Sequence, residues 1–249
     1  MVAEAGLENL VLWLGTAAML LGTLVFFWLG RSVAVYEQNF FVMAISITVI
    51  AAAAYLAMAL GMGRVTVGGD EVLVARYIDW LLTTPLILVL LGILARARKS
   101  LVATLVGVDI FMIVAGLLGA IADTLSVSLV WWSVGSIAYI VILYLLLGAL
   151  SDAASKQPDA VAGVYTTLRN LTVVLWSIYP VVWVLGGNAV GVLPAVVDGT
   201  VVVALDVFSK VGFGYILLSS HETLRVYGFY GAEREKVADD DAADDAMSA

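Results

Sequence analysis

The sequence predicts an all-α membrane protein, a bundle of seven helices that cross the bilayer. Of its 249 residues, 63% are hydrophobic, and the mean hydropathy is +1.06, which is typical of integral membrane proteins. At ~20 residues per span plus short connections, this length accommodates about seven spans. Seven apolar segments follow one another along the chain, at roughly 10–30, 40–62, 74–95, 101–122, 128–150, 165–185 and 192–220.

The charges predict how these segments are oriented and where the membrane domain ends. Nine of the twelve Lys and Arg residues lie in or close to the first, third and fifth connections or after the last segment, and only Arg64 lies in the second. Positive loops stay in the cytoplasm, so we expect an extracellular N-terminus and a cytoplasmic C-terminus in a multi-pass plasma membrane protein. We divide the chain into a transmembrane domain, residues 1–225, and an acidic, disordered cytoplasmic tail, residues 226–249. The glycine-rich loop 63–71 predicts a short hairpin.

Several classes of chemistry are excluded by composition. The chain has no cysteine and a single histidine, His221. Disulfides, thiolate metal sites, cysteine nucleophiles and histidine metal clusters are therefore not expected. We expect no metal site and no nucleic-acid partner.

The last segment contains an acid and a base where a spanning helix should be apolar. Asp206 and Lys210 lie near its middle, and burying either charge costs at least ~2.5–3.5 kcal/mol on insertion scales. Their four-residue spacing places them on one helix face, one turn apart. One interpretation is an ion pair within a channel or transporter. The other is that Lys210 is a desolvated amine that condenses with an aldehyde as a Schiff base, with Asp206 as a counter-ion.

The third segment carries a second polar group of residues, in the stretch ARYIDWLLTTP. Arg76, Asp79 and Thr83 share one helix face at i, i+3 and i+7. Thr83 can hydrogen-bond to Asp79 one turn deeper in the span. An Arg76–Asp79 ion pair at the helix mouth is the alternative, but Asp79 lies several residues inside the span. Pro85 is expected to kink this helix or loosen its hydrogen bonds.

Aromatic residues in the sixth segment are compatible with a slot for a flat ligand. Trp176, Tyr179 and Trp183 recur at i, i+3 and i+7 and reach the middle of the span. Aromatic residues near span ends also form interfacial belts, so both interpretations remain open. With Trp80, these residues would suit a conjugated, apolar ligand. Asp109, in the fourth segment, is expected to be hydrogen-bonded across helices.

Together these stretches resemble the microbial (archaeal) rhodopsin family. The resemblance rests on RYIDWLLTTP, RNLTVVLWSIYPVVW and LDVFSKVGFG, and it extends over nearly all seven segments. It implies all-trans-retinal, bound to Lys210 as a protonated Schiff base. Asp79 would be the primary counter-ion and proton acceptor, Asp206 the second counter-ion, and Arg76 and Thr83 part of the same site. The family positions that line the retinal pocket are Trp80, Thr84, Met112, Gly116, Trp132, Trp176, Tyr179 and Trp183.

Within that family, the sequence is most similar to the sensory rhodopsin II and middle rhodopsin groups. In the proton pumps an aspartate lies eleven residues after the counter-ion, about 16 Å towards the cytoplasm on the same helix face. This aspartate returns a proton to the Schiff base. Here that residue is Leu90, which cannot donate. Ser209, which we also assign to the retinal site, is a hydroxyl residue as in the sensors, and Gly135 is sensor-like. Asp109, in contrast, is pump-like.

The resemblance implies a light-sensing retinal photoreceptor and not an enzyme. In this interpretation, photoisomerisation drives proton transfer to Asp79 and a conformational signal. The alternative is a light-driven outward proton pump of bacteriorhodopsin type, although the pumps' extracellular release pair is incomplete, with Asn188 and Asp198 at its two positions. A chloride pump is disfavoured because Asp79 occupies a position that must be uncharged. A non-retinal channel or transporter would give no visible absorption band with added retinal.

The resemblance also suggests which partners to expect. A membrane-embedded transducer is the candidate partner of a sensor, but Ala204 and Pro194 stand where sensors use a tyrosine and a threonine for this contact. We further expect a homo-oligomer in the lipid bilayer, since both dimers and trimers occur among relatives.

Overall fold

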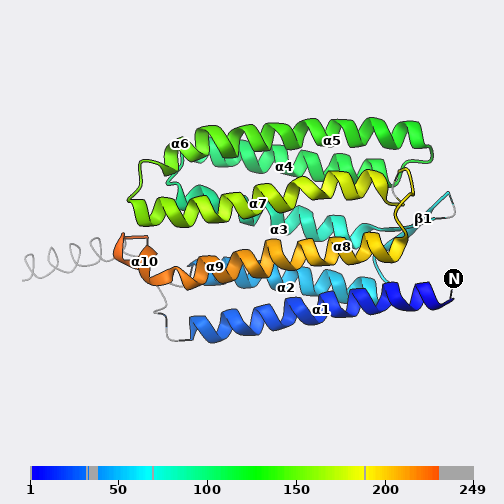
Figure 1. Cartoon of the computed structure of the whole chain (residues 1–249), viewed down its shortest axis with the longest axis horizontal. Coiled ribbons are helices and arrows are strands. Elements are labelled where there is room, and N and C mark those ends of the chain that lie inside the picture. Colours follow the sequence, from blue (N-terminus) through cyan, green and yellow to red (C-terminus); the bar gives the residue numbers. More distant parts are fainter. Residues whose placement is uncertain (1, 32, 34–38, 69, 188, 230–249) are drawn as a thin grey trace, which may run out of the picture.

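The computed structural model describes residues 2–31, 33, 39–68, 70–187 and 189–229. Within this part of the chain, seven helices are long and apolar enough to cross a membrane, and they run side by side as one bundle (Figure 1). The predicted fold class is therefore confirmed. The first four spans are α1 (Val2–Gly30), α2 (Asn39–Ala59), α3 (Val74–Leu94) and α4 (Lys99–Ala120).

Two of the remaining three spans are interrupted by a π-helical turn. The fifth span consists of α5 (Leu125–Leu145), the turn η2 (Leu146–Leu150) and α6 (Ser151–Ala154). The sixth is α7 (Asp159–Leu185), and the seventh consists of α8 (Ala195–Val207), the turn η3 (Phe208–Gly212) and α9 (Phe213–Ser219). A short helix, α10 (His221–Val226), follows. Such π-turns are rare and frequently mark functional sites, and η3 contains Lys210.

The predicted hairpin is present between α2 and α3. Strands β1 (Arg64–Val67) and β2 (Asp70–Leu73) pair antiparallel, with Arg64 opposite Leu73. Gly68, in the turn, has a φ of +61°, which glycine adopts without strain. The guanidinium of Arg64 forms an ion pair with Glu71 at 2.6 Å, across the two strands.

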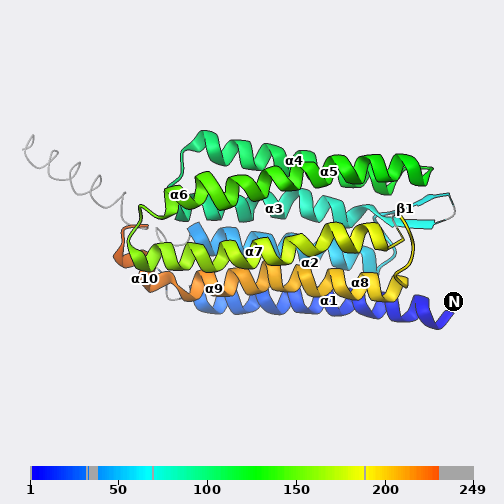
Figure 2. The same cartoon turned by 45° about the horizontal axis from the view of Figure 1, so that its top comes forward.

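The helices form a closed arrangement with two spans at its centre. Consecutive helices pack against one another, α8 returns to pack on α1, and α3 contacts α7 across the bundle; Figure 2 shows the same arrangement from a second side. The third and seventh spans are the most buried. In the most apolar stretch of each, 61% and 56% of the residues are buried inside the protein. These are the two spans that carry Asp79 and Lys210, so the fold places both residues in the interior.

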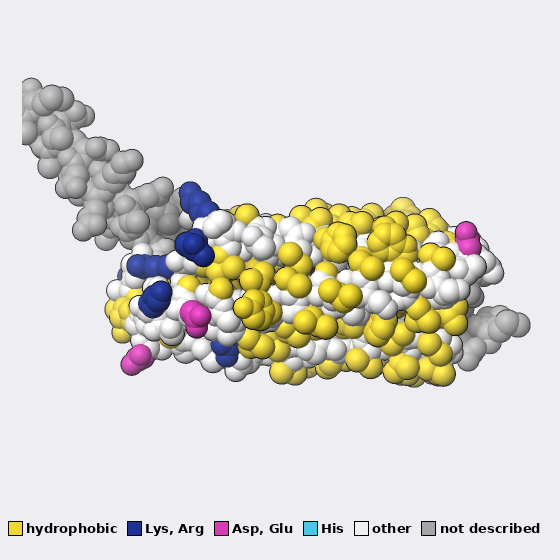
Figure 3. Space-filling view, turned by 90° about the horizontal axis from the view of Figure 1, so that it is seen from above, with side chains coloured by type: hydrophobic (Ala, Val, Ile, Leu, Met, Phe, Trp, Pro, Cys, Tyr) yellow, Lys and Arg dark blue, Asp and Glu magenta, His cyan; other side chains and the backbone are white. Residues whose placement is uncertain are grey.

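The surface matches a molecule embedded in a bilayer. Figure 3 shows hydrophobic side chains over the length of the bundle and Lys and Arg side chains gathered at the end where α10 lies. Arg96, Arg98 and Lys99, in the connection between α3 and α4, are exposed. This distribution agrees with the prediction, from the positive-inside rule, that this end faces the cytoplasm.

The described structure extends a few residues past the predicted domain end at residue 225. Arg96 donates a hydrogen bond to the carbonyl of Tyr227 at 3.0 Å, and its guanidinium lies 4.7 Å from the ring centre of Phe229. These contacts join the chain after α10 to the connection between α3 and α4. Residues 230–249 of the predicted acidic tail lie outside the described residues.

Candidate functional site

Lys210 lies at the centre of the site, between two carboxylates from different helices. Its Nζ forms an ion pair and hydrogen bond with Asp79 Oδ2, and it is 3.5 Å from Asp206 Oδ1. All three side chains are only 1% exposed. The predicted shared face of Asp206 and Lys210 is thus present, and α3 brings Asp79 to the same amine from a segment more than a hundred residues away in the sequence.

Asp206 is held by three hydrogen-bond donors. The hydroxyls of Tyr55 and Tyr179 donate to its two carboxylate oxygens at 2.6 Å each, and Trp80 Nε1 donates at 3.0 Å. These donors come from α2, α7 and α3. Bonds to an ionised acceptor are the stronger class of hydrogen bond, so this network fixes the Asp206 carboxylate in place and ties four helices together.

Asp79 has the threonine partner that the sequence predicts. Thr83 Oγ1 lies 3.4 Å from Asp79 Oδ1 and donates to the Asp79 backbone carbonyl at 2.8 Å. The simpler alternative of an Arg76–Asp79 ion pair is not what the structure has. Arg76 pairs with Asp198 of α8 instead, at 3.9 Å. Asn188, the other residue of the predicted release pair, lies outside the described residues.

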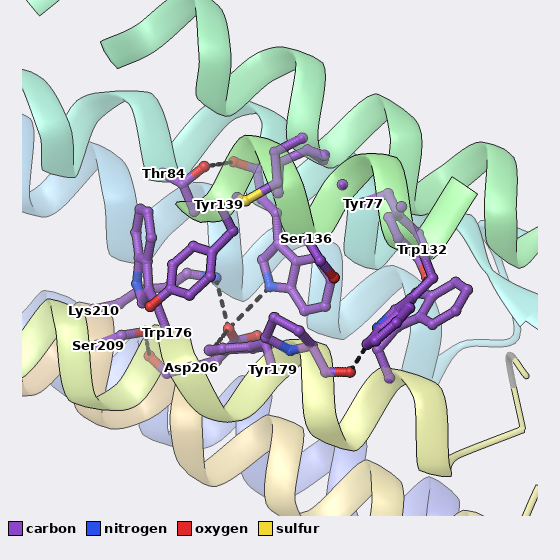
Figure 4. A pocket seen from close by; sticks show the side chains of 17 residues that line it. Tyr77, Thr84, Trp132, Ser136, Tyr139, Trp176, Tyr179, Asp206, Ser209 and Lys210 are labelled. Carbon is purple, nitrogen blue, oxygen red and sulfur yellow. Dashed lines mark hydrogen bonds and ion pairs between the residues drawn. The ribbon is translucent and has the colours of Figure 1, made fainter. Parts of the chain in front are cut away.

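An apolar cavity begins at Lys210 and extends towards α5. Seven of the seventeen residues that line it are aromatic. All ten residues predicted for the cofactor site line it, namely Trp80, Thr84, Met112, Gly116, Trp132, Trp176, Tyr179, Trp183, Ser209 and Lys210. Figure 4 shows Trp176 and Tyr179 among the aromatic side chains that line it, with Lys210 at one side.

The walls of this cavity suit a flat ligand. The rings of Trp80 and Tyr179 meet edge to face, with centres 5.3 Å apart and planes at 87°. Trp132 Nε1 donates to the carbonyl of Pro180 at 2.9 Å, which fixes that indole. At Gly116 the nearest side-chain atom to an added Cβ would be 3.5 Å away. The sixth-segment aromatics therefore form a pocket wall and are not limited to an interfacial belt.

Asp109 has the cross-helix partner that was expected. It is fully buried in α4, and Thr84 of α3 donates to its Oδ2 at 2.7 Å. This bond joins the third and fourth spans beside the cavity, because Thr84 also lines it.

Sequence reasoning missed several residues of the site. Tyr55 was not singled out, because nothing in α2 alone indicates that its hydroxyl reaches a carboxylate 151 residues away. Ser136 and Tyr139 also line the cavity. They follow Trp132 by four and seven residues, which is the spacing of one helix face, so periodicity along the fifth segment could have found them.

The geometry defines a seven-helix membrane protein with a buried amine at one end of an aromatic pocket. A family model described as "Bacteriorhodopsin-like protein" matches residues 6–224. The chain therefore belongs to the bacteriorhodopsin-like family of microbial rhodopsins. It is 45% identical to a bacteriorhodopsin of Haloterrigena sp. (strain arg-4) over 230 residues, which cover 90% of this chain and 92% of the relative.

Two further relatives cover nearly as much of the chain. Sensory rhodopsin-2 of Natronomonas pharaonis is 40% identical over 213 residues, 86% of this chain and 89% of the relative. The crystal structure of a thermophilic rhodopsin from Rubrobacter xylanophilus superposes with a TM-score of 0.84 at 40% identity, over 87% of this chain and 97% of that one. Pumps and sensors are thus about equally similar to this protein.

Membership of the family identifies the cofactor and the location. Bacteriorhodopsin-like proteins bind retinal through a Schiff base to a lysine, and in this chain a buried lysine adjoins an apolar, tryptophan-lined cavity. The residues present therefore fit retinal. The protein is a multi-pass plasma membrane protein, and members of its family are typically non-enzymatic light-driven pumps or sensors.

Proposed function

We propose that this protein is a light sensor that pumps protons poorly. We attribute the poor pumping to Leu90. Leu90 is fully buried in α3, in the hydrophobic cluster that also contains Ala44, Phe213 and Leu217. A leucine has no proton to donate. The cytoplasmic half of the bundle is therefore a barrier to proton return, and a long-lived photoproduct has time to signal.

On the side of Lys210 away from Leu90, the surrounding residues can accept the proton of the Schiff base. Retinal, when bound to Lys210 as a protonated Schiff base, supplies the light-driven isomerisation that displaces the proton. Asp79 Oδ2 contacts Nζ directly, so we assign Asp79 as the proton acceptor. Asp206, held by its three donors, stays in place as the second counter-ion, and Thr83 orients the Asp79 carboxylate.

The same network supplies a route for the conformational signal. The Tyr179 hydroxyl bonds to Asp206, which joins α7 to α8 beside the lysine. Ser209 precedes Lys210 in the π-turn and lines the cavity next to Tyr179. A change of charge at Asp79 and Lys210 alters the forces on this junction, so we expect α7 and the seventh span to move relative to one another.

A membrane-embedded transducer is the proposed partner. Ala204 and Pro194 are exposed in the structure, and neither side chain can form a hydrogen bond. Binding at these two positions would therefore rest on packing alone, which small residues favour between membrane helices.

Outward proton pumping is the second candidate, and one observation favours it. A polar cavity lined by Arg76 and Asp198 opens at the end of the bundle opposite α10, which offers an exit for a proton from the Asp79 side.

Light-induced pH change in a dense, unbuffered suspension of cells that express the protein with retinal separates the two functions. A sensor gives little acidification alone and clear acidification with azide, a diffusible proton donor. Strong acidification without azide, abolished by a protonophore, would favour the pump. The absence of a visible absorption band would refute both.

A further inference from the structure

One serine in the cavity wall has a buried hydroxyl that the fold leaves unused. Ser136 Oγ is inaccessible to solvent and has no hydrogen-bond partner among the described residues. Serines in helices usually bond to a carbonyl of the preceding turn. Ser133, three residues earlier in α5, does so with the carbonyl of Leu129 at 2.8 Å. Ser136 lines the cavity instead.

This hydroxyl lies in the part of the cavity wall that α5 forms. Figure 4 shows Trp132 of α5 on the side away from Lys210, with Ser136 between the two. A retinal attached to Lys210 would therefore place its ring near α5. Tyr139, the other hydroxyl residue of α5 in this wall, is already engaged, since its hydroxyl contacts Ser177 Oγ at 2.8 Å and the carbonyl of Val173 at 3.2 Å.

The residue before Ser136 contributes no side chain to the cavity wall. Gly135 lines the cavity beside Ser136, and glycine has no Cβ. A ligand group can therefore approach the backbone of α5 more closely here than at a residue with a side chain.

We infer that the pocket accepts ring-oxygenated retinals, which carry a hydroxyl or carbonyl group on the ring, and that Ser136 hydrogen-bonds to that oxygen. A hydrocarbon ring cannot bond to Ser136, and a buried polar group without a partner is unfavourable. A ring oxygen removes this penalty. The inference rests on the attachment of retinal to Lys210 that the proposed function also requires.

Competition between two aldehydes tests the inference. Apoprotein is incubated with equal amounts of all-trans-retinal and all-trans-4-hydroxyretinal, and, in a parallel series, with all-trans-3-hydroxyretinal. The bound chromophores are then extracted and quantified. One net hydrogen bond corresponds to a preference of about 5-fold. We expect at least one hydroxyretinal to be enriched by about this factor in the wild type and to lose the enrichment in Ser136→Ala.

Ser133→Ala is the matched control, because it removes a hydroxyl from the same helix that already has a partner. It should leave the ratio unchanged. Equal enrichment in the wild type and Ser136→Ala, or none in the wild type with either hydroxyretinal, would overturn the inference. If neither retinal nor its hydroxylated forms gave a visible band, the proposed function itself would fail.

A second measurement needs no variant and so does not depend on how Ser136→Ala folds. The wild-type protein is regenerated with all-trans-4-oxoretinal, and the infrared band of the ring carbonyl is recorded. A hydrogen bond from Ser136 should lower its frequency relative to the same chromophore in an apolar solvent. An unshifted band would contradict the hydrogen bond.

Discussion

Replacing Leu90 by aspartate should accelerate the return of a proton to the Schiff base at Lys210. Leu90 follows Asp79 by eleven residues in one uninterrupted helix, α3. Eleven residues place it about 16 Å further along the axis on nearly the same face. An aspartate there would lie between Lys210 and the cytoplasm and could donate a proton.

The size of the effect follows from the source of the proton. Without an internal donor, the proton must come from solution through a buried apolar cluster. The rate of Schiff base reprotonation should therefore fall about tenfold for each unit by which the pH rises. A positioned donor typically contributes about 10²–10⁴-fold. We therefore expect Leu90→Asp to accelerate the return of the visible band by about 100-fold at pH 8. The dependence on pH should largely disappear below the pKa of the new carboxyl group.

Flash photolysis of purified protein between pH 5 and pH 9 measures both quantities. Leu90→Asn is the control, because it introduces a polar side chain of nearly the same shape as aspartate but cannot release a proton. It should retain the wild-type dependence on pH. If Leu90→Asp left the decay and its pH dependence unchanged, or if the wild-type decay were independent of pH, another donor would exist and the sensor proposal would lose its main support.

Four further outcomes are expected. Lys210→Ala should abolish the visible band after retinal is added, and a surviving band would place the attachment elsewhere. Asp79→Asn should keep a band but shift it to the red, because an anion beside the nitrogen stabilises the ground state more than the excited state; absorption spectra of both variants test this. Gly214→Ala should lower stability by about 1–3 kcal/mol, since its Cβ would lie 2.5 Å from the Phe26 ring. Gly107→Ala, whose Cβ would meet nothing within 4 Å, should be neutral or slightly stabilising, as measured by thermal loss of colour.

Much of the fold could be predicted because the bilayer imposes simple rules on the sequence. Backbone groups in hydrocarbon must bond within their own segment, so long apolar runs become helices. The predicted hairpin also formed, since its turn supplies a glycine with positive φ at Gly68. The ends of spans were less predictable. The fifth span continues to Ala154 and the seventh begins at Ala195, because π-turns and connections depend on packing against neighbouring helices.

The chemistry of the site was predictable to the extent that each residue is unusual in its own segment. Asp79, Asp206 and Lys210 are charges in hydrocarbon, and such charges indicate function without any knowledge of their neighbours. The spacing of the tryptophans of the sixth span was compatible with a ligand wall but left an interfacial belt open, and the structure decided between the two.

Which residues meet was decided only by the tertiary structure. Tyr55 reaches Asp206, and Arg76 pairs with Asp198 and not with Asp79, because these contacts depend on how helices distant in sequence are rotated and packed. The sequence alone determined that the chain spans the membrane seven times and carries a buried amine and acids, since hydrophobicity and charge are properties of each segment. Only the packed bundle shows that the amine lies between two of those acids beside an apolar, aromatic-lined cavity, and that Ser136 Oγ in its wall has no hydrogen-bond partner among the described residues. Distances between helices are set by their packing, which no single segment encodes.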